Sequence, residues 1–131
     1  MKLKTILKHV SLTLLLTLGC ASLAAAQSQQ DPRLAQLADA GGCEFPELPT
    51  IPDAAGATME QMVATQGAIQ AYIGESNALL ECLEKITANT NLSEEDRQLA
   101  LDAYNGEVTN QESLAERWNV QRTRFLELQK Q

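Results

Sequence analysis

The chain has 131 residues, a net charge of −7 and only 4% aromatic residues. This length suits one small domain, and the acidic balance argues against binding to nucleic acid or to anionic membrane surfaces. The one histidine, His9, lies in the N-terminal segment, so the rest of the chain lacks an imidazole base, a histidine metal ligand and a serine-histidine-aspartate triad.

Residues 1–26 have the pattern of a secretory signal peptide. Three lysines precede an apolar run from Val10 to Leu18, and small residues follow up to Ala26. The run is too short to span a membrane, and no later stretch approaches the roughly twenty apolar residues of a transmembrane helix. Cleavage before Gln27 removes three of the ten basic residues and none of the 17 acidic ones, which leaves a net charge of −10. We therefore expect a periplasmic or secreted protein.

An alternative N-terminus is Cys20. Leu18-Gly19-Cys20 resembles the bacterial lipobox, in which the cysteine is acylated and becomes the first residue. Thr17 departs from that pattern, which has an aliphatic residue three positions before the cysteine. The small residues around Ala26 favour plain secretion. Under the alternative, the same domain would be anchored to a membrane by lipid.

Residues 27–57 form an N-terminal arm that contains a short helix. Asp31 is a capping residue followed by proline, which predicts a helix from Pro32 to Ala40, and Gly41-Gly42 predicts its end. The apolar side chains of this helix are two leucines and several alanines, which allow only a loose contact with the rest of the domain.

The arm continues with proline at every third position from Pro46 to Pro52. Three residues per turn is the period of polyproline II, which places Phe45, Leu48 and Ile51 on one edge. A ligand for the aromatic groove of another protein is one interpretation. The apolar edge favours the other, in which residues 43–53 pack on their own domain.

A long helix is predicted from Thr58 to Thr87, beginning with a capping box at Thr58 and Gln61. It carries two apolar seams that step by alternating threes and fours. The first seam consists of Met62, Gln66, Ile69, Ile73, Ser76, Leu80 and Leu83. The second consists of Thr65, Ala68, Tyr72, Glu75, Leu79, Cys82 and Ile86. We expect a second helix to cover the first seam and residues 43–53 to cover the second.

Loss of Cys20 with the signal peptide leaves Cys43 and Cys82, which predicts one disulfide in an oxidising compartment. The polyproline II steps from Cys43 to Asp53 span about 31 Å, and the helical steps from Thr58 to Cys82 span about 36 Å. An arm that doubles back along the helix therefore brings the two cysteines together. The disulfide would leave no thiolate nucleophile.

A second long helix is predicted from Glu94 to about Leu128, capped by Ser93, with the acids at 94–96 as its solvated first turn. Its seam consists of Leu101, Tyr104, Val108, Gln111, Ala115, Trp118, Arg122 and Phe125. The heptad phase is the same on both sides of Asn105-Gly106, so we expect the helix to continue through that point. Residues 58–131 thus form an antiparallel, coiled-coil-like hairpin. It brings the basic residues near the C-terminus close to Glu47, Asp53 and Glu60, namely Arg117, Arg122, Arg124 and Lys130.

No catalytic, cofactor or metal site is predicted. The chain has no P-loop, dinucleotide glycine motif or HExxH motif. Met59 and Met62 could bind copper(I) through sulfur, but core filling explains this pair better. Asn105 and Asn119 lie beside the seam, either as buried residues that determine register or as exposed amides. A hydrolase that depends on two carboxylates is the less favoured enzymatic alternative.

Several of these features occur together in one known group of proteins. They are Cys43 with Pro46, Pro49 and Pro52, then Ala57-Thr58, Tyr72, Cys82-Leu83 and the spacing Asn105, Asn119, Phe125. The chain resembles small uncharacterised exported proteins of Gram-negative bacteria over residues 43–125. The resemblance implies a periplasmic location and a similar helical layout. It implies no activity and no binding residues.

The sequence therefore predicts an all-α protein, an antiparallel two-helix hairpin with a polyproline II segment packed along its first helix and one disulfide between Cys43 and Cys82. We expect a non-catalytic periplasmic interaction or accessory protein with an unidentified protein partner; the alternative is a structural lipoprotein acylated at Cys20. Two helices and the polyproline II segment make a thin core. A homodimer that forms a four-helix bundle would supply the missing cover.

Overall fold

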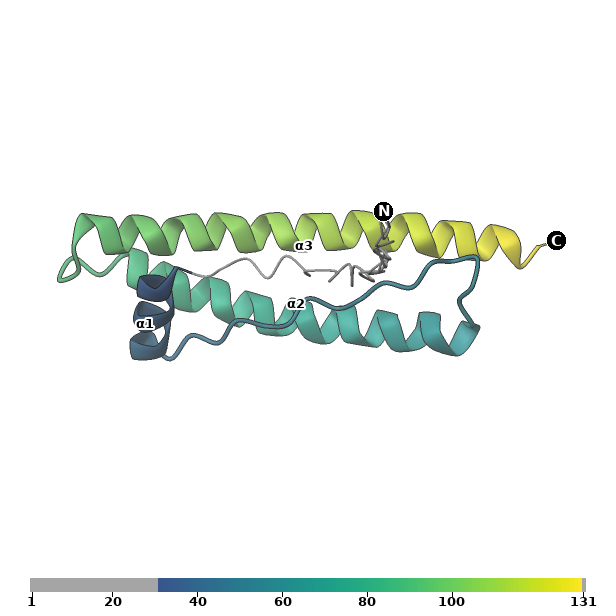
Figure 1. The fold of residues 1–131 in the computed structure, drawn as a ribbon, viewed down its shortest axis with the longest axis horizontal. Coiled ribbons are helices and arrows are strands. Elements are labelled where there is room, and N and C mark those ends of the chain that lie inside the picture. Colours follow the sequence, from purple (N-terminus) through teal and green to yellow (C-terminus); the bar gives the residue numbers. More distant parts are fainter. Residues whose placement is uncertain (1–30, 131) are drawn as a thin grey trace, which may run out of the picture.

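A computed structural model describes residues 31–130 of the chain, and these residues form three helices and no strand. The helices are α1 (Pro32–Gly41), α2 (Met59–Thr87) and α3 (Glu94–Leu128). The two long helices lie antiparallel and side by side, with a short turn between them (Figure 1). The predicted signal peptide and Cys20 lie outside the described residues.

Each helix begins at the cap that the sequence predicts. Asp31 caps α1, Thr58 and Gln61 form a complete capping box on α2, and Ser93 caps α3. These side chains satisfy amide groups that have no partner within the helix. α1 ends at Gly41 and is capped by Gly42, whose φ of 69° lies in the left-handed region that a residue without a Cβ adopts most easily.

α3 is one continuous helix through Asn105-Gly106, so the prediction of continuity is confirmed. A Cβ added at Gly106 would meet nothing within 4 Å, which shows that no close contact requires glycine at this position. The helical hydrogen bonds and the packing on both sides therefore outweigh the glycine's unfavourable helix propensity of about 1 kcal/mol.

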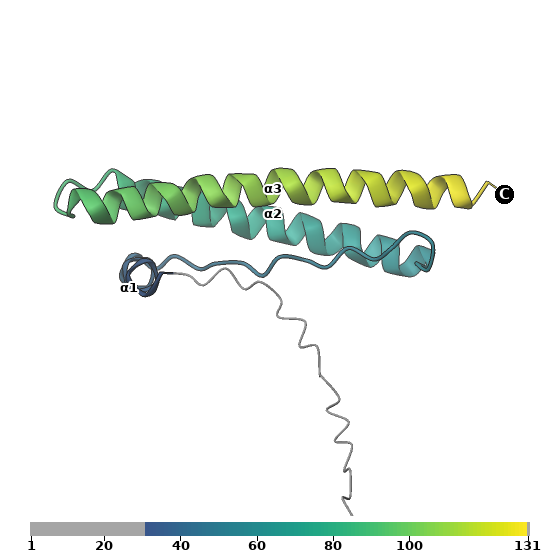
Figure 2. The same ribbon diagram turned by 45° about the horizontal axis from the view of Figure 1, so that its top comes forward.

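α1 has a larger role than the loose contact predicted for it, and the prediction of a two-helix hairpin omits it from the core. In Figure 2 α1 is seen nearly end-on, because it crosses the ends of the two long helices. Leu34 and Ala38 are buried against α2 and α3. The disulfide and an ion pair between Arg33 and Asp96 hold α1 at this place.

Residues 43–53 are neither helix nor strand and run back along the hairpin from α1 to its opposite end (Figures 1 and 2). The first part lines a groove with α2, and the second part, Leu48 to Ile51, lines a groove with α3. The backbone N–H of Ala54 then donates to Oε1 of Gln121 on α3 at 2.9 Å. The predicted packing along the first long helix therefore describes only the first part, because the segment lies between two helices.

The core consists of two apolar clusters at opposite ends of the hairpin. The first, beneath α1, is made of Leu34, Ala38, Cys43, Leu79, Leu83, Ile86 and Ala100. The second consists of Ala54, Met62 and Phe125. Between them the buried side chains include the polar residues Ser76 and Glu107.

The predicted seam of α3 is displaced from the stripe that is buried. Of its eight residues only Phe125 is buried, while Leu101, Ala115 and Arg122 are exposed. The buried positions are instead Asp96, Ala100, Glu107, Leu114 and Phe125. The buried stripe is rotated because α3 packs against α1 and the extended segment as well as against α2.

Both predicted seams of α2 contribute to the core, with gaps. The first is buried at Met62, Ser76 and Leu83 and exposed at Gln66. The second is buried at four positions and exposed at two; the buried ones are Thr65, Tyr72, Leu79 and Ile86.

Candidate functional site

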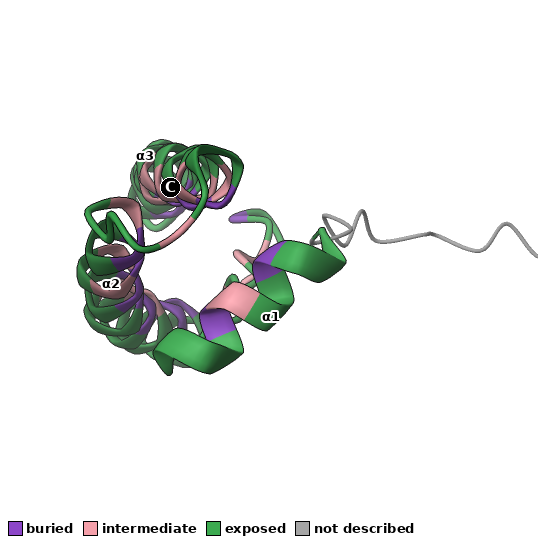
Figure 3. Cartoon of the chain, turned by 90° about the vertical axis from the view of Figure 1, so that its left-hand side faces the viewer, coloured by how far each residue is buried: buried purple, intermediate pink, exposed green. Residues whose placement is uncertain are grey.

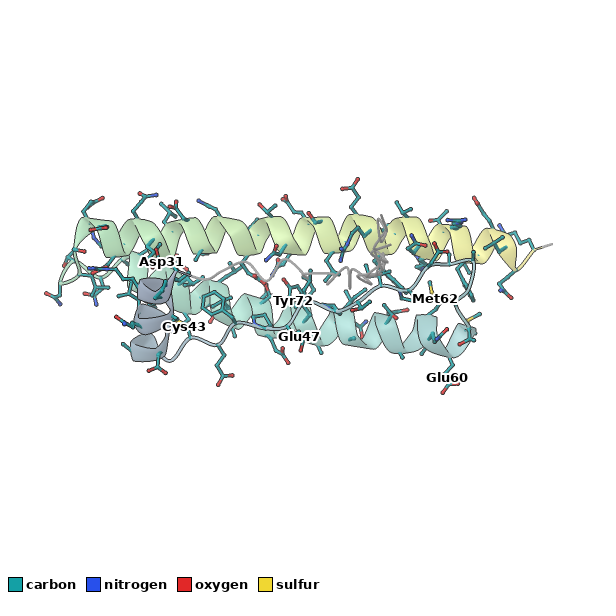
Figure 4. The ribbon with its side chains drawn as sticks, viewed as in Figure 1. Asp31, Cys43, Glu47, Glu60, Met62 and Tyr72 are labelled. Carbon is teal, nitrogen blue, oxygen red and sulfur yellow. A yellow bond between two sulfur atoms is a disulfide. The ribbon has the colours of Figure 1, made fainter. Side chains whose placement is uncertain are left out.

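A buried carboxylate joins α2 to α3 at the middle of the hairpin. Glu107 is 7% exposed, and its Oε1 accepts hydrogen bonds from Tyr72 Oη at 2.7 Å and from Ser76 Oγ at 2.5 Å. Its Oε2 accepts from Nδ2 of Asn110 at 3.1 Å. Figure 4 shows Tyr72 between the two long helices. Three donors thus replace the water that a buried carboxylate loses.

The network continues from the core to the surface. Ser76 Oγ donates to Glu107 and accepts from Nε2 of Gln111 at 2.7 Å, so the hydroxyl is used in both directions. The same Nε2 lies 3.1 Å from Oδ1 of Asn77, an exposed residue. Because these bonds join defined positions on two helices, they determine the register of α2 against α3.

Burial, followed by the hydrogen bond to Glu107, raises the pKa of Tyr72 well above its ordinary value. The phenol is therefore harder to deprotonate than an exposed tyrosine, and its hydroxyl remains a hydrogen-bond donor to the carboxylate. Ser76 is fully buried and its proton is directed at Glu107, so its hydroxyl does not face a substrate. These contacts support a structural role for the network rather than acid–base catalysis.

The predicted disulfide between Cys43 and Cys82 is confirmed, with Cα atoms 5.6 Å apart and a sequence separation of 39. It attaches the start of the extended segment to α2. Gly41 lies two residues before Cys43, and a Cβ at this position would lie only 3.1 Å from Cδ1 of Ile86. The close approach of the chain to α2 next to the disulfide therefore favours a glycine.

The acids at the start of α3 do more than the solvated first turn that we predicted. Asp96 is buried and paired with Arg33 of α1. The hydrogen bond from Arg33, followed by the one from Ser93, lowers the pKa of Asp96. Arg124 lies 4.0 Å from Asp53, which agrees with the predicted approach of the basic residues to the acids of the arm.

The structure separates the other residues that the sequence singled out. Met62 is buried in the core, whereas Met59 is 58% exposed, so the two sulfurs do not share one environment. Asn105 and Asn119 are both exposed, which decides for the exposed-amide alternative. Within residues 31–130, no three His, Cys, Asp or Glu side chains are grouped so as to hold a metal ion.

Glu107 is the buried polar residue that the sequence reasoning missed. Ala100, Glu107 and Leu114 are all buried and are spaced seven residues apart. This heptad spacing was the feature of the sequence that could have indicated a buried Glu107. The apolar seam chosen instead runs one position later, through Leu101 and Val108.

One side of the hairpin is covered and the other is open. Figure 3 shows α1 and the extended segment on one side of α2 and α3. The α2 residues that line the groove on that side include Glu75, Ala78 and Cys82. Ile73 and Leu80 are offset by two positions from these residues, which is about 200° around a helix with 3.6 residues per turn, so they face the other side.

We define the open face as the two rows of residues on that other side. On α2 the row is Met59, Val63, Gln66, Gln70, Ile73, Asn77, Leu80 and Glu84. On α3 the row is Leu101, Asn105, Val108, Glu112, Ala115, Asn119, Arg122 and Leu126. All of these residues are exposed or half-buried. Four large apolar side chains on it are exposed, namely Met59, Val63, Leu101 and Leu126.

No helix in the described part of the chain is long and apolar enough to cross a membrane. Comparisons with protein-family models, with curated proteins and with solved structures find no match to this chain.

Proposed function

We propose that this protein is an exported, non-catalytic interaction module that binds a partner protein through the open face. The observation that carries the proposal is the asymmetry of cover. The chain's own α1 and extended segment cover one side of α2 and α3, whereas the other side has no such cover and carries four of the seven large apolar side chains that are exposed in residues 31–130. Half of the sixteen positions of the open face are apolar, and apolar residues that recur on one face of a helix are the anchors that a partner helix recognises.

The proposed location is the periplasm of a Gram-negative bacterium. The signal-peptide pattern of residues 1–26 and the resemblance to small exported proteins support export. The disulfide between Cys43 and Cys82 is compatible with an oxidising compartment outside the cytoplasm. Acylation at Cys20, which would make the protein a tethered structural lipoprotein, is the second candidate, motivated by the lipobox-like Leu18-Gly19-Cys20.

The proposal of a non-catalytic role is supported by how the polar groups are used. The buried carboxylate of Glu107 accepts three hydrogen bonds from the protein itself, and the carboxylate of Asp96 is paired with Arg33. A carboxylate-dependent hydrolase needs two carboxylates that face one substrate. We also propose that residues 43–53 adopt polyproline II, as their proline period indicates.

Site-specific photo-crosslinking in the exporting cell tests the interaction. A photo-reactive residue in place of Gln70, which is exposed on the open face, should give a covalent product with a protein partner. The matched control replaces Ser113, which is exposed on the side of α3 away from this face and should give none. Absence of any product from Gln70, or equal products from both positions, would contradict the proposal.

The intact mass of the protein recovered from the periplasm tests the compartment. A mass that begins at Gln27 and lies two hydrogens below that of the reduced protein is expected. A lipid-modified Cys20 as the first residue would contradict cleavage before Gln27 and support the lipoprotein alternative.

A further inference from the structure

We propose that the partner of the open face is a second copy of this chain, paired antiparallel so that two hairpins form a four-helix bundle. The inference rests on the proposed function, because it names the partner of the same face. In this arrangement a two-fold axis lies perpendicular to the helices, and each long helix packs against its own copy in the other chain.

The spacing of the open face is complementary to itself. Both rows step by alternating fours and threes over 25 positions, from Met59 to Glu84 on α2 and from Leu101 to Leu126 on α3. This is the heptad spacing of a coiled-coil seam, and 25 steps correspond to about 37 Å. When a row is paired with its own reverse, Leu101 of one copy lies opposite Leu126 of the other, and Val63 lies opposite Leu80. The remaining apolar residues of the rows lie opposite polar ones, so these two kinds of apolar pair are the anchors of the interface.

The two rows share one centre, as a single two-fold axis requires. The centre of the α2 row lies between Gln70 and Ile73, and that of the α3 row lies between Glu112 and Ala115. Ser76 bonds to Glu107 directly and to Gln111, which establishes the levels of the two helices. The centre of the α2 row lies about four residues before Ser76. Because the helices are antiparallel, the same level on α3 lies about four residues after Glu107 and Gln111, at residues 111–115. The same axis therefore pairs both helices in register.

Charge favours the antiparallel orientation. The end of the hairpin that contains the start of α2 and the end of α3 is close to neutral, because Arg117, Arg122, Arg124 and Lys130 are balanced by Asp53, Glu60, Glu116 and Glu127. The opposite end carries an excess of acids, which include Glu84 on α2 and Glu94, Glu95 and Asp102 on α3. An antiparallel pair places each neutral end over the acidic end of the other copy, whereas a parallel pair places acid over acid.

The area of the face is sufficient for a specific dimer. Two adjacent helices, each about 10 Å wide, make a surface of about 37 by 20 Å, or about 740 Å² for each copy. A standard protein interface buries about 800 Å² per partner. The polar residues near the centre, such as Gln66 and Asn77, can pair as amides and select one register.

Sedimentation equilibrium of the purified, disulfide-bonded chain tests the dimer. We compare Leu126→Glu on the open face with Val120→Glu, which is 58% exposed on the other side of α3. Both variants add one negative charge to an exposed apolar position of the same helix, so they change the net charge equally. Leu126→Glu faces the acidic end of the other copy and should weaken the dimer about tenfold or more, while Val120→Glu should change its Kd less than about twofold.

Photo-crosslinking of the purified chain is a second measurement that does not depend on these variants. A photo-reactive residue in place of Leu101 should give a covalent dimer whose cross-link maps to the peptide that contains Leu126. A purified chain that stays monomeric and gives no self-product overturns the dimer, as does a dimer disrupted by Val120→Glu and not by Leu126→Glu. In that case an in-cell product of Gln70 with a different protein retains the proposed function, and no product at all overturns both.

Discussion

The hydroxyl of Tyr72 offers a direct test of the buried network, because Tyr72→Phe removes one oxygen and leaves the ring in place. Tyr72 is 3% exposed and its hydroxyl donates to Glu107 at 2.7 Å. Without it, the carboxylate keeps only the donors Ser76 and Asn110. We expect the variant to fold with the same helices and lower stability.

The size of the effect follows from the kind of bond that is lost. A hydrogen bond to a carboxylate contributes about 1.5–3 kcal/mol, and the removed hydroxyl leaves little space because the ring stays packed. For a domain of this size, a loss of about 2 kcal/mol lowers the melting temperature by roughly 10 °C.

Urea denaturation followed by circular dichroism, with the disulfide intact, measures this change in the free energy of unfolding. Tyr104→Phe is the matched control, because Tyr104 is a half-buried tyrosine on α3 that lies outside the network. It should cost less than about 0.5 kcal/mol. Equal losses for the two variants, or no loss for Tyr72→Phe, would refute the structural role that we assign to the network.

Three further predictions concern the arm and α3. Reduction of the Cys43–Cys82 disulfide, which closes a separation of 39 residues, should lower the free energy of unfolding by about 4 kcal/mol, measured by denaturation with and without reductant. The lowered pKa of Asp96 contributes stability that is present above about pH 4, its ordinary range, and is lost as the pH falls through the folded value. Asp96→Asn should therefore flatten the loss of stability on acidification, and an unchanged slope would contradict the pairing with Arg33. Gly106 lies on a continuous helix with open space around it, so Gly106→Ala should stabilise the protein by about 1 kcal/mol. A lower melting temperature for this variant would contradict an unstrained helix at this position.

The helix boundaries were predictable because their determinants are local. Asp31, Thr58 and Ser93 accept hydrogen bonds from amides within the next three residues, so the sequence around each cap contains the whole interaction. The disulfide was predictable for a different reason. Only Cys43 and Cys82 follow the predicted signal peptide, and the lengths of residues 43–53 and of α2 match.

The buried network was not predictable in the same way. Tyr72 and Glu107 are separated by 35 positions, and the bond between them exists only in one register of α2 against α3. Sequence periodicity placed the seam of α3 on its apolar residues, such as Leu101 and Val108. The buried stripe follows Ala100 and Glu107 instead, since a polar side chain is acceptable in a core when donors surround it.

The sequence by itself thus determined which segments are helical, where they begin and end, and which cysteines pair, because capping and periodicity act over a few residues and only two cysteines follow residue 26. Only the tertiary structure decided which face of α3 is buried, how α1 enters the core through Arg33 and Asp96, and that the extended segment crosses from α2 to Gln121 of α3. These outcomes depend on what packs against each helix from two sides at once. The same three-body packing leaves one side of the hairpin open, which no single stretch of sequence specifies.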